Sequence, residues 1–98
     1  MSIVLVGGHD RMHDIYKAVC KKFGHKVKVF TQMPAKFNRQ IGNPDGILLF
    51  TKTVSHKMVG VAIKEAKRKN IPVVRCHNSS TVSLEQSIKL LENNAKAC

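Results

Sequence analysis

Short apolar runs alternate with longer mixed stretches along this chain. Four such runs stand out: SIVLVGG at 2–8, KVKVF at 26–30, GILLFT at 46–51 and PVVRC at 72–76. Each is rich in Val, Ile, Leu or Phe and is followed by polar residues or glycine, which is typical of strands. The pattern therefore predicts four strands.

The first gap between these runs has the spacing of a helix. Ile15, Val19 and Phe23 recur at i, i+4 and i+8, which predicts an amphipathic helix over residues 10–23. Gly24 follows directly and is a suitable residue to end it. The first two strands are therefore expected to be joined by a helix.

Two further helices are predicted nearer the C-terminus. An apolar stripe at helical spacing covers residues 55–69, and the cations of its last turn suit the negative end of a helix. Ser83 and Gln86 have the spacing of a capping box. The last helix is therefore expected to begin at Ser83 and to end near Asn93 or Asn94.

A shorter helix is expected over residues 34–41. Pro34 suits the first position of a helix and Gly42 suits its end, so this segment has room for at most two turns. The NPDG sequence that follows is typical of a turn. The second and third strands are thus joined by a short connection.

Strands that alternate with helices form a parallel sheet with helices on its faces. The first and third runs are apolar on both sides of the pleat, which indicates central strands. The second run alternates lysine with valine, which indicates an edge strand. We therefore expect one α/β domain over residues 1–98, with a frayed tail at 92–98. Its expected architecture is a flavodoxin-like or Rossmann-like three-layer sandwich with a four-stranded parallel sheet in the order 2-1-3-4.

The carboxyl ends of the strands meet at one edge of such a sheet, and ligands bind there. We call this edge the carboxyl rim; it comprises residues 7–11, 51–56 and 75–81. Glycines allow a tight turn, helix N-termini present N–H groups, and arginine and hydroxyl side chains donate hydrogen bonds, so the rim suits an anion. The alternative is that the glycines only serve the turn and the hydroxyls only cap helices. The candidate ligand-binding residues are Gly7, Gly8, His9, Arg11, Thr53, Ser55, His56, Asn78, Ser79 and Ser80.

The charge of the chain changes the range of partners. Lys and Arg number 17 and Asp and Glu number 6, so the net charge is +11, which favours anionic partners unless it serves only solubility. With one Tyr and four Phe, little is left for base stacking, so any nucleic-acid binding is expected to be sequence-independent and salt-sensitive. The cations at helical spacing that could contact phosphates are Lys17, Lys21, Lys64, Lys67 and Arg68.

Histidines give a second interpretation of the same edge. Four of the five, His9, His13, His56 and His77, fall at or near the carboxyl rim. A cluster of imidazoles could ligate a transition metal or haem, or could titrate near neutral pH. The glutamate that follows the first histidine in metalloprotease helices is absent from HDRMH, so hydrolytic zinc chemistry is disfavoured.

No catalytic constellation is visible in the sequence. Cys76 ends a strand, but the HNSSTVS that follows it contains no arginine to bind a phosphoryl group, so we interpret Cys76 as a buried residue. No base stands at a recognisable spacing from a nucleophile. Catalysis is therefore not the function that we expect.

The cysteines and the apolar content indicate a compartment. Cys20, Cys76 and Cys98 have no disulfide-framework spacing, which fits a reducing environment, and Cys20 is expected in the core. No stretch approaches the ~18 apolar residues of a membrane span, and no signal peptide is visible. We expect a cytoplasmic protein without a membrane partner.

The segments IVLVGGHDRM, TVSHKM and HNSSTVSLEQ resemble a small bacterial family known only as a domain of unknown function, DUF2325, and the resemblance covers nearly the whole chain. Relatives of greater length carry a cysteine before the Val-Ser-His, where this chain has Thr53. The resemblance implies no established activity. Relatives are associated with haem binding, and if this chain shares that property, the resemblance implies that His56 contributes to it. The recurring elements of the family correspond here to Gly7, Gly8, Arg11, Ser55, His56, Ser79 and Ser80.

Three functions are therefore expected in order. The first is a small binding domain that holds a phosphate-bearing or otherwise anionic small molecule at the carboxyl rim. The second is a haem or metal module that uses the rim histidines, and the third is an accessory that binds nucleic acid non-specifically or binds a protein partner. Self-association into a homo-oligomer stays open under each of them.

Overall fold

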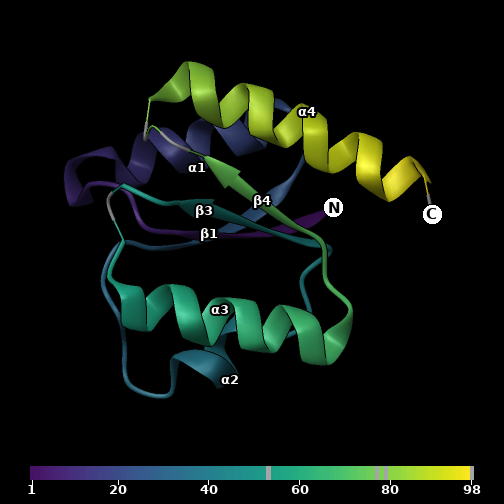
Figure 1. Cartoon of the computed structure of the whole chain (residues 1–98). Helices are drawn as coiled ribbons and strands as arrows, with labels where there is room; N and C mark the ends of the chain where they lie inside the picture. The colour runs from purple at the N-terminus through teal and green to yellow at the C-terminus, as the bar shows by residue number, and fades with distance from the viewer. Residues whose placement is uncertain (53, 77, 79, 98) are drawn as a thin grey trace.

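A four-stranded parallel sheet forms the middle layer of the computed structural model (Figure 1). The structure describes residues 1–52, 54–76, 78 and 80–97, with side chains up to Asn93. The strands pair in the order β2-β1-β3-β4, which confirms the predicted order. Their bounds are β1 Ser2–Val6, β2 Lys26–Phe30, β3 Gly46–Phe50 and β4 Val73–Cys76.

Helices cover both faces of the sheet, so the protein has the predicted three-layer α/β fold. Figure 1 shows α1 and α4 on one face and α2 and α3 on the other. In the part of the chain that the structure describes, no helix combines the length and the apolar character that crossing a membrane requires. The helical segments are η1 Asp10–Met12, α1 His13–Lys22, α2 Phe37–Ile41, α3 His56–Lys69 and α4 Thr81–Ala97.

Burial divides the strands into central and edge positions. Every residue of β3 is buried, as are the last four residues of β1, because helices pack on both faces of these strands. In β2, Val27 and Val29 pack toward α1 and α4, whereas Lys26 and Lys28 are exposed on the side of α2. The alternation of lysine and valine thus identified an edge strand correctly.

The buried face of α1 agrees only in part with the predicted stripe, because Val19 and Phe23 pack against the core and Ile15 does not. Tyr16 and Cys20 are fully buried, so the prediction of a core position for Cys20 is confirmed, but Ile15 is 45% exposed. Ile15 and Tyr16 lie on neighbouring ridges of the helix, and the larger ring takes the core position against Phe50, with ring centroids 5.2 Å apart. The predicted stop at Gly24 is confirmed, because Gly24 has φ +78° and its N–H donates to a carbonyl of the last turn.

Two helix starts were predicted wrongly. Helix α2 begins at Phe37 and not at Pro34, because Lys36 adopts a left-handed conformation with φ 56° directly before it. Helix α4 begins at Thr81, two residues before Ser83, since Ser80 caps it. It continues to Ala97, beyond the end expected near Asn93 or Asn94.

Candidate functional site at the carboxyl rim

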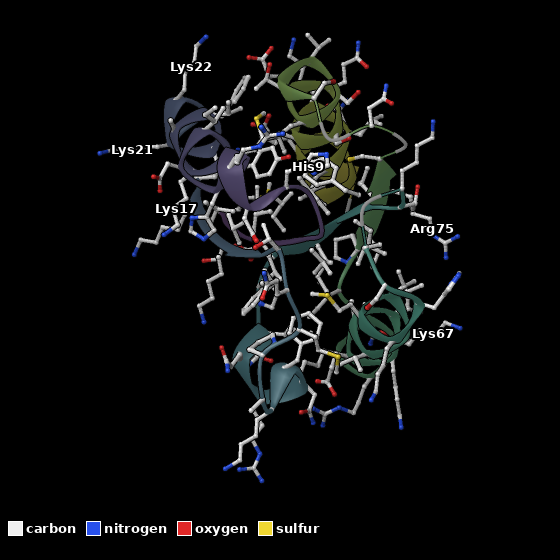
Figure 2. All side chains as sticks on the ribbon, turned by 90° about the vertical axis from the view of Figure 1, so that its left-hand side faces the viewer. His9, Lys17, Lys21, Lys22, Lys67 and Arg75 are labelled. Carbon is white, nitrogen blue, oxygen red and sulfur yellow. The ribbon has the colours of Figure 1, made fainter. Side chains whose placement is uncertain are left out.

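Segments far apart in sequence contact each other at the carboxyl rim. Gly7 directly follows β1. A Cβ added to it would lie 3.1 Å from the carbonyl oxygen of Phe50, the last residue of β3, and 3.0 Å from Cβ of Val54, in the loop after β3. The backbone N–H of Thr51 donates to the carbonyl of Cys76, at the end of β4, over 2.9 Å. The ends of β1, β3 and β4 therefore form one continuous surface. Figure 2 looks onto this end of the sheet, with His9 labelled.

The paired glycines have structural roles in this arrangement. Gly7 has φ +101° and Gly8 has φ +88°, a region that favours glycine. The N–H of Gly7 donates to the carbonyl of Phe30 over 2.8 Å, and a Cβ on Gly8 would lie 2.7 Å from Cε2 of Tyr16. The sheet already uses the N–H of Gly7, so this group is not free to bind a ligand.

Two of the candidate serines act as helix caps. The Oγ of Ser55 accepts the N–H of Met58 over 3.2 Å and caps α3. The Oγ of Ser80 accepts the N–H of Ser83 over 3.3 Å at the start of α4. Both hydroxyls thus satisfy N–H groups of a first helical turn. Two other candidates, Thr53 and Ser79, lie outside the described residues.

Four candidate side chains are exposed at the rim. His9 and Arg11 follow β1, His56 is the first residue of α3, and Asn78 follows β4. Within the described part of the chain, no ion pair engages His9, Arg11 or His56. These side chains can therefore reach a ligand without first breaking an internal ion pair.

Asp10 has a role at the rim that sequence reasoning did not assign. Its carboxylate accepts hydrogen bonds from the hydroxyl of Thr31 and, over 2.9 Å, from Nε2 of Gln32. These bonds, first the one from Thr31 and then the one from Gln32, hold the pKa of Asp10 below its ordinary value. Asp10 thus ties the loop after β1 to the segment after β2, and it also leaves one negative charge on this surface.

The histidines do not meet in a metal site within the described residues. No group of three or more His, Cys, Asp or Glu side chains in that part of the chain is placed to hold a metal ion. Nδ1 of His13 lies 3.6 Å from the carboxylate of Asp14, and His77 lies outside the described residues.

The two described cysteines are buried and protonated. Burial raises the pKa of the Cys20 thiol to about 11. Burial likewise raises the pKa of Cys76, against a smaller opposing effect of the hydroxyl of Ser87, which lies 2.7 Å from its sulfur. Both cysteines are core residues, as expected. Because a protonated, buried thiol is a poor nucleophile, neither is suited to attack a substrate.

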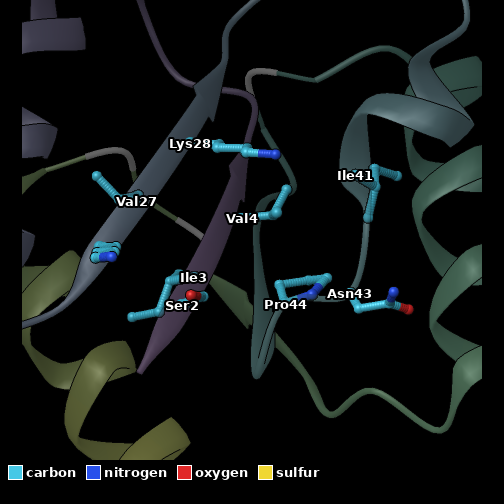
Figure 3. Close-up of a pocket in the computed structure, with 9 residues that line it drawn as sticks. Ser2, Ile3, Val4, Val27, Lys28, Ile41, Asn43 and Pro44 are labelled. Carbon is cyan, nitrogen blue, oxygen red and sulfur yellow. The ribbon is translucent and has the colours of Figure 1, made fainter.

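A hollow of about 320 Å³ lies away from the rim, near the first residues of β1 and β2 (Figure 3). Val4, Ile41 and Pro44 give it apolar walls, and Lys28 reaches across it, with Nζ 3.4 Å from the carbonyl of Gln40. Sequence reasoning missed this hollow. The alternation in β2 predicted that its lysines share one face of an edge strand. It did not predict that the short helix α2 leaves part of that face uncovered.

The comparisons with known proteins are consistent with the resemblance noted in the sequence. They found no match among curated proteins, and they found no match among solved structures. A family model described as "uncharacterized protein conserved in bacteria (DUF2325)" matches residues 2–91. Because this match spans nearly the whole chain, the protein belongs to the DUF2325 family of bacteria.

Proposed function

We propose that the protein binds a phosphate-bearing small molecule at the carboxyl rim. The observation that carries this proposal is the contact between Gly7 and Val54, which brings the loops after β1 and β3 side by side. Arg11 and His9 lie in or directly after the first loop, and His56 directly follows the second. Basic side chains from two adjacent loops are a suitable arrangement for one phosphate group.

Internal hydrogen bonds already occupy some of the rim groups that could otherwise bind the ligand. The N–H of Gly7 and the hydroxyls of Ser55 and Ser80 have partners within the protein. Recognition therefore depends on side chains, with Arg11 as the bidentate cation and with His9 and His56 as donors when protonated. Such a ligand is held at an open surface, so its affinity falls with added salt. We place this function in the cytoplasm, because the cysteine spacing fits a reducing compartment.

Thermal unfolding with and without ligand tests the proposal. Nucleotides, sugar phosphates and inorganic phosphate are added one by one to the whole protein. A ligand at ten times its Kd stabilises the folded state by about 1.4 kcal/mol, which raises the midpoint of a domain of this size by roughly 6–11 °C. Calorimetric titration of each compound that shifts the midpoint then gives Kd.

Two arginine variants decide where the compound binds. Arg11→Gln is expected to weaken binding at least ~10-fold, the loss of a charge-assisted bidentate pair. The matched control is Arg39→Gln, at another exposed arginine, in α2, and it is expected to leave Kd unchanged. The proposal fails if no phosphate compound shifts the midpoint, or if Arg11→Gln binds as tightly as the unsubstituted protein.

A further inference from the structure

The outer side of α3 carries a row of cations. With about 100° of rotation per residue, five exposed positions of this helix fall within one arc of about 100°, opposite the buried stripe of Met58, Ala62 and Ala66. We call this arc the α3 ridge; it consists of Lys57, Gly60, Lys64, Lys67 and Arg68. All of its side chains other than that of the glycine are positively charged.

One acidic residue of α3, Glu65, contacts the edge of the α3 ridge. Glu65 is the acid of α3, and its side chain is only 8% exposed. Its carboxylate accepts from Arg68 over 2.9 Å and lies 3.3 Å from Nζ of Lys69. In α1, by contrast, the fully exposed Asp14 stands one turn before Lys17. Glu65 therefore offsets the charge of Arg68, whereas Lys57, Lys64 and Lys67 have no ion pair among the described residues.

Hollows flank the α3 ridge on both sides. One of about 450 Å³ lies between α3 and the free edge of β4, where Lys67 and Arg75 stand. Another hollow, of about 260 Å³, lies between α3 and the segment around α2, and Lys36 and Lys64 are among the residues that line it. Figure 2 shows Lys67 and Arg75 on the same side of the molecule. Each hollow thus has a lysine of the α3 ridge at its border, and Glu65 also lines the smaller one.

Gly60 lies on the α3 ridge without a reason inside the protein. Glycine in the middle of a helix costs about 1 kcal/mol relative to alanine. A Cβ added to Gly60 would meet no described atom within 4 Å other than those of its chain neighbours and of the backbone of its own helix, so packing within the chain does not require glycine. Without a side chain at Gly60, the helix backbone between Lys57 and Lys64 is open to close approach.

The aromatic residues decide which kind of polyanion fits. Tyr16, Phe37 and Phe50 are at most 1% exposed. Phe23 and Phe30 are partly buried, each against the hydrophobic core on one face of the sheet. Binding of single-stranded nucleic acid uses bases stacked on exposed aromatic rings, and no aromatic ring of the described residues is largely exposed. A double helix keeps its bases stacked and presents its phosphates instead.

From these observations we propose that the α3 ridge binds the phosphate backbone of a double-stranded nucleic acid without reading its sequence. Helix α3 has 14 residues, about 21 Å in length, which corresponds to about six base pairs of a duplex. DNA and RNA duplexes share the phosphodiester chemistry that the lysines contact. This function is separate from the carboxyl rim, so either one can fail alone.

Two triple variants of equal charge test the proposal. Lys57→Gln/Lys64→Gln/Lys67→Gln removes three charges from the α3 ridge, and Lys17→Gln/Lys21→Gln/Lys22→Gln removes three from α1, on another side of the molecule (Figure 2). Binding to 20-base-pair DNA and RNA duplexes is measured by gel shift at several salt concentrations. The α3 variant is expected to flatten the slope of log K against log salt by about 2.7, about 0.9 for each lost phosphate contact. The α1 variant is expected to keep the slope.

The outcomes separate the duplex from other partners. Equal losses in both triple variants would show that net charge alone drives binding, and the proposal would be overturned. It would also be overturned by no binding at about 50 mM salt, by tighter binding to a single strand of equal length, or by binding to anionic vesicles in place of duplexes. The DNA and RNA arms show which duplex is preferred.

A single substitution tests the close approach at Gly60. Leucine is a better helix former than glycine, so Gly60→Leu keeps α3 folded, which circular dichroism verifies. Its side chain would fill the space between Lys57 and Lys64 and is expected to weaken duplex binding several-fold with all charges retained. Unchanged binding would contradict a duplex seated on the α3 ridge.

Discussion

Two glycines of this chain show how the surroundings of one residue set the effect of a substitution. Gly8 has a positive φ and faces the ring of Tyr16 at a distance that excludes a Cβ. Gly60 lies in a regular helix turn with open space where its Cβ would be. The same methyl group is therefore excluded at one position and accommodated at the other.

Alanine at these positions is expected to have opposite effects. Gly8→Ala should lower the free energy of unfolding by about 2–4 kcal/mol, since it adds a left-handed backbone cost to an overlap with Tyr16. Gly60→Ala should raise it by about 0.5–1 kcal/mol. Urea unfolding followed by circular dichroism measures both. A neutral Gly8→Ala would mean that Tyr16 can move aside at little cost.

At the scale of the elements, the start of α4 is set by hydrogen bonds to both the side chain and the backbone of one residue at the carboxyl rim. Helix α4 begins where the Oγ of Ser80 accepts the N–H of Ser83 and the carbonyl of Ser80 accepts the N–H of Leu84. This is the geometry of an N-cap residue. Ser80 therefore fixes where the chain turns from the carboxyl rim into α4.

Loss of this cap is the expected outcome of Ser80→Ala. The substitution should lower the free energy of unfolding by about 0.5–1 kcal/mol, because the N–H of Ser83 loses its partner. Ser83→Ala, three residues along the same helix, removes the hydroxyl that accepts from Oγ of Ser80 over 3.1 Å. It keeps the bond from the N–H of residue 83 to Ser80 and should change stability by less than about 0.5 kcal/mol. Thermal unfolding compares the two variants. If Ser83→Ala were the more damaging one, the capping box predicted from the sequence would describe α4 better than Ser80 does.

The sequence allowed the sheet to be predicted well because strand order depends on hydrophobic pattern. Runs apolar on both faces had to be central, and the run with alternating lysines had to be an edge. The start of α2 was wrong because one left-handed residue, Lys36, delays it, and the helix pattern does not encode that conformation. The prediction for α1 was wrong at Ile15 because Ile15 and Tyr16 are adjacent apolar residues, and only packing against Phe50 selects one of them.

The candidate site was predictable in its position but not in its composition. Parallel topology alone brings the loops after β1, β3 and β4 together, as the contact between Gly7 and Val54 shows. Which groups stay free depends on hydrogen bonds that form after folding. Ser55 and Ser80 become caps, and Asp10 takes the side chains that follow β2. Spacing in the sequence gives no sign of the contacts that Asp10 makes.

The whole molecule carries more positive charge than its own acids can balance. Its Cα dimensions are 33 × 29 × 20 Å, so at about 0.01 M salt, where the screening length is about 30 Å, nearly every charge interacts with every other. The net charge of +11 therefore opposes the compact state through self-repulsion. Added salt shortens the screening length to about 8 Å at physiological strength.

The midpoint of thermal unfolding is accordingly expected to rise by several degrees between about 0.01 and 0.15 M sodium chloride. The triple variant of Lys17, Lys21 and Lys22 has a net charge of 11 − 3 = +8 and should show a smaller rise. Circular dichroism at neutral pH records both series. A midpoint independent of salt would mean that the cations are too far apart to destabilise the fold.

The single tyrosine of the chain has a practical consequence. The sequence contains no tryptophan, and Tyr16 is fully buried, against Phe50 and beside Gly8. Tyrosine fluorescence of the folded protein therefore originates from one ring at the junction between β1 and α1. A ligand that displaces the loop around Gly8 would change this emission without any attached label. A duplex on α3 is expected to leave it unaltered once the absorption of light by the nucleic acid is corrected for. The chain carries its own optical reporter for one of its two proposed surfaces.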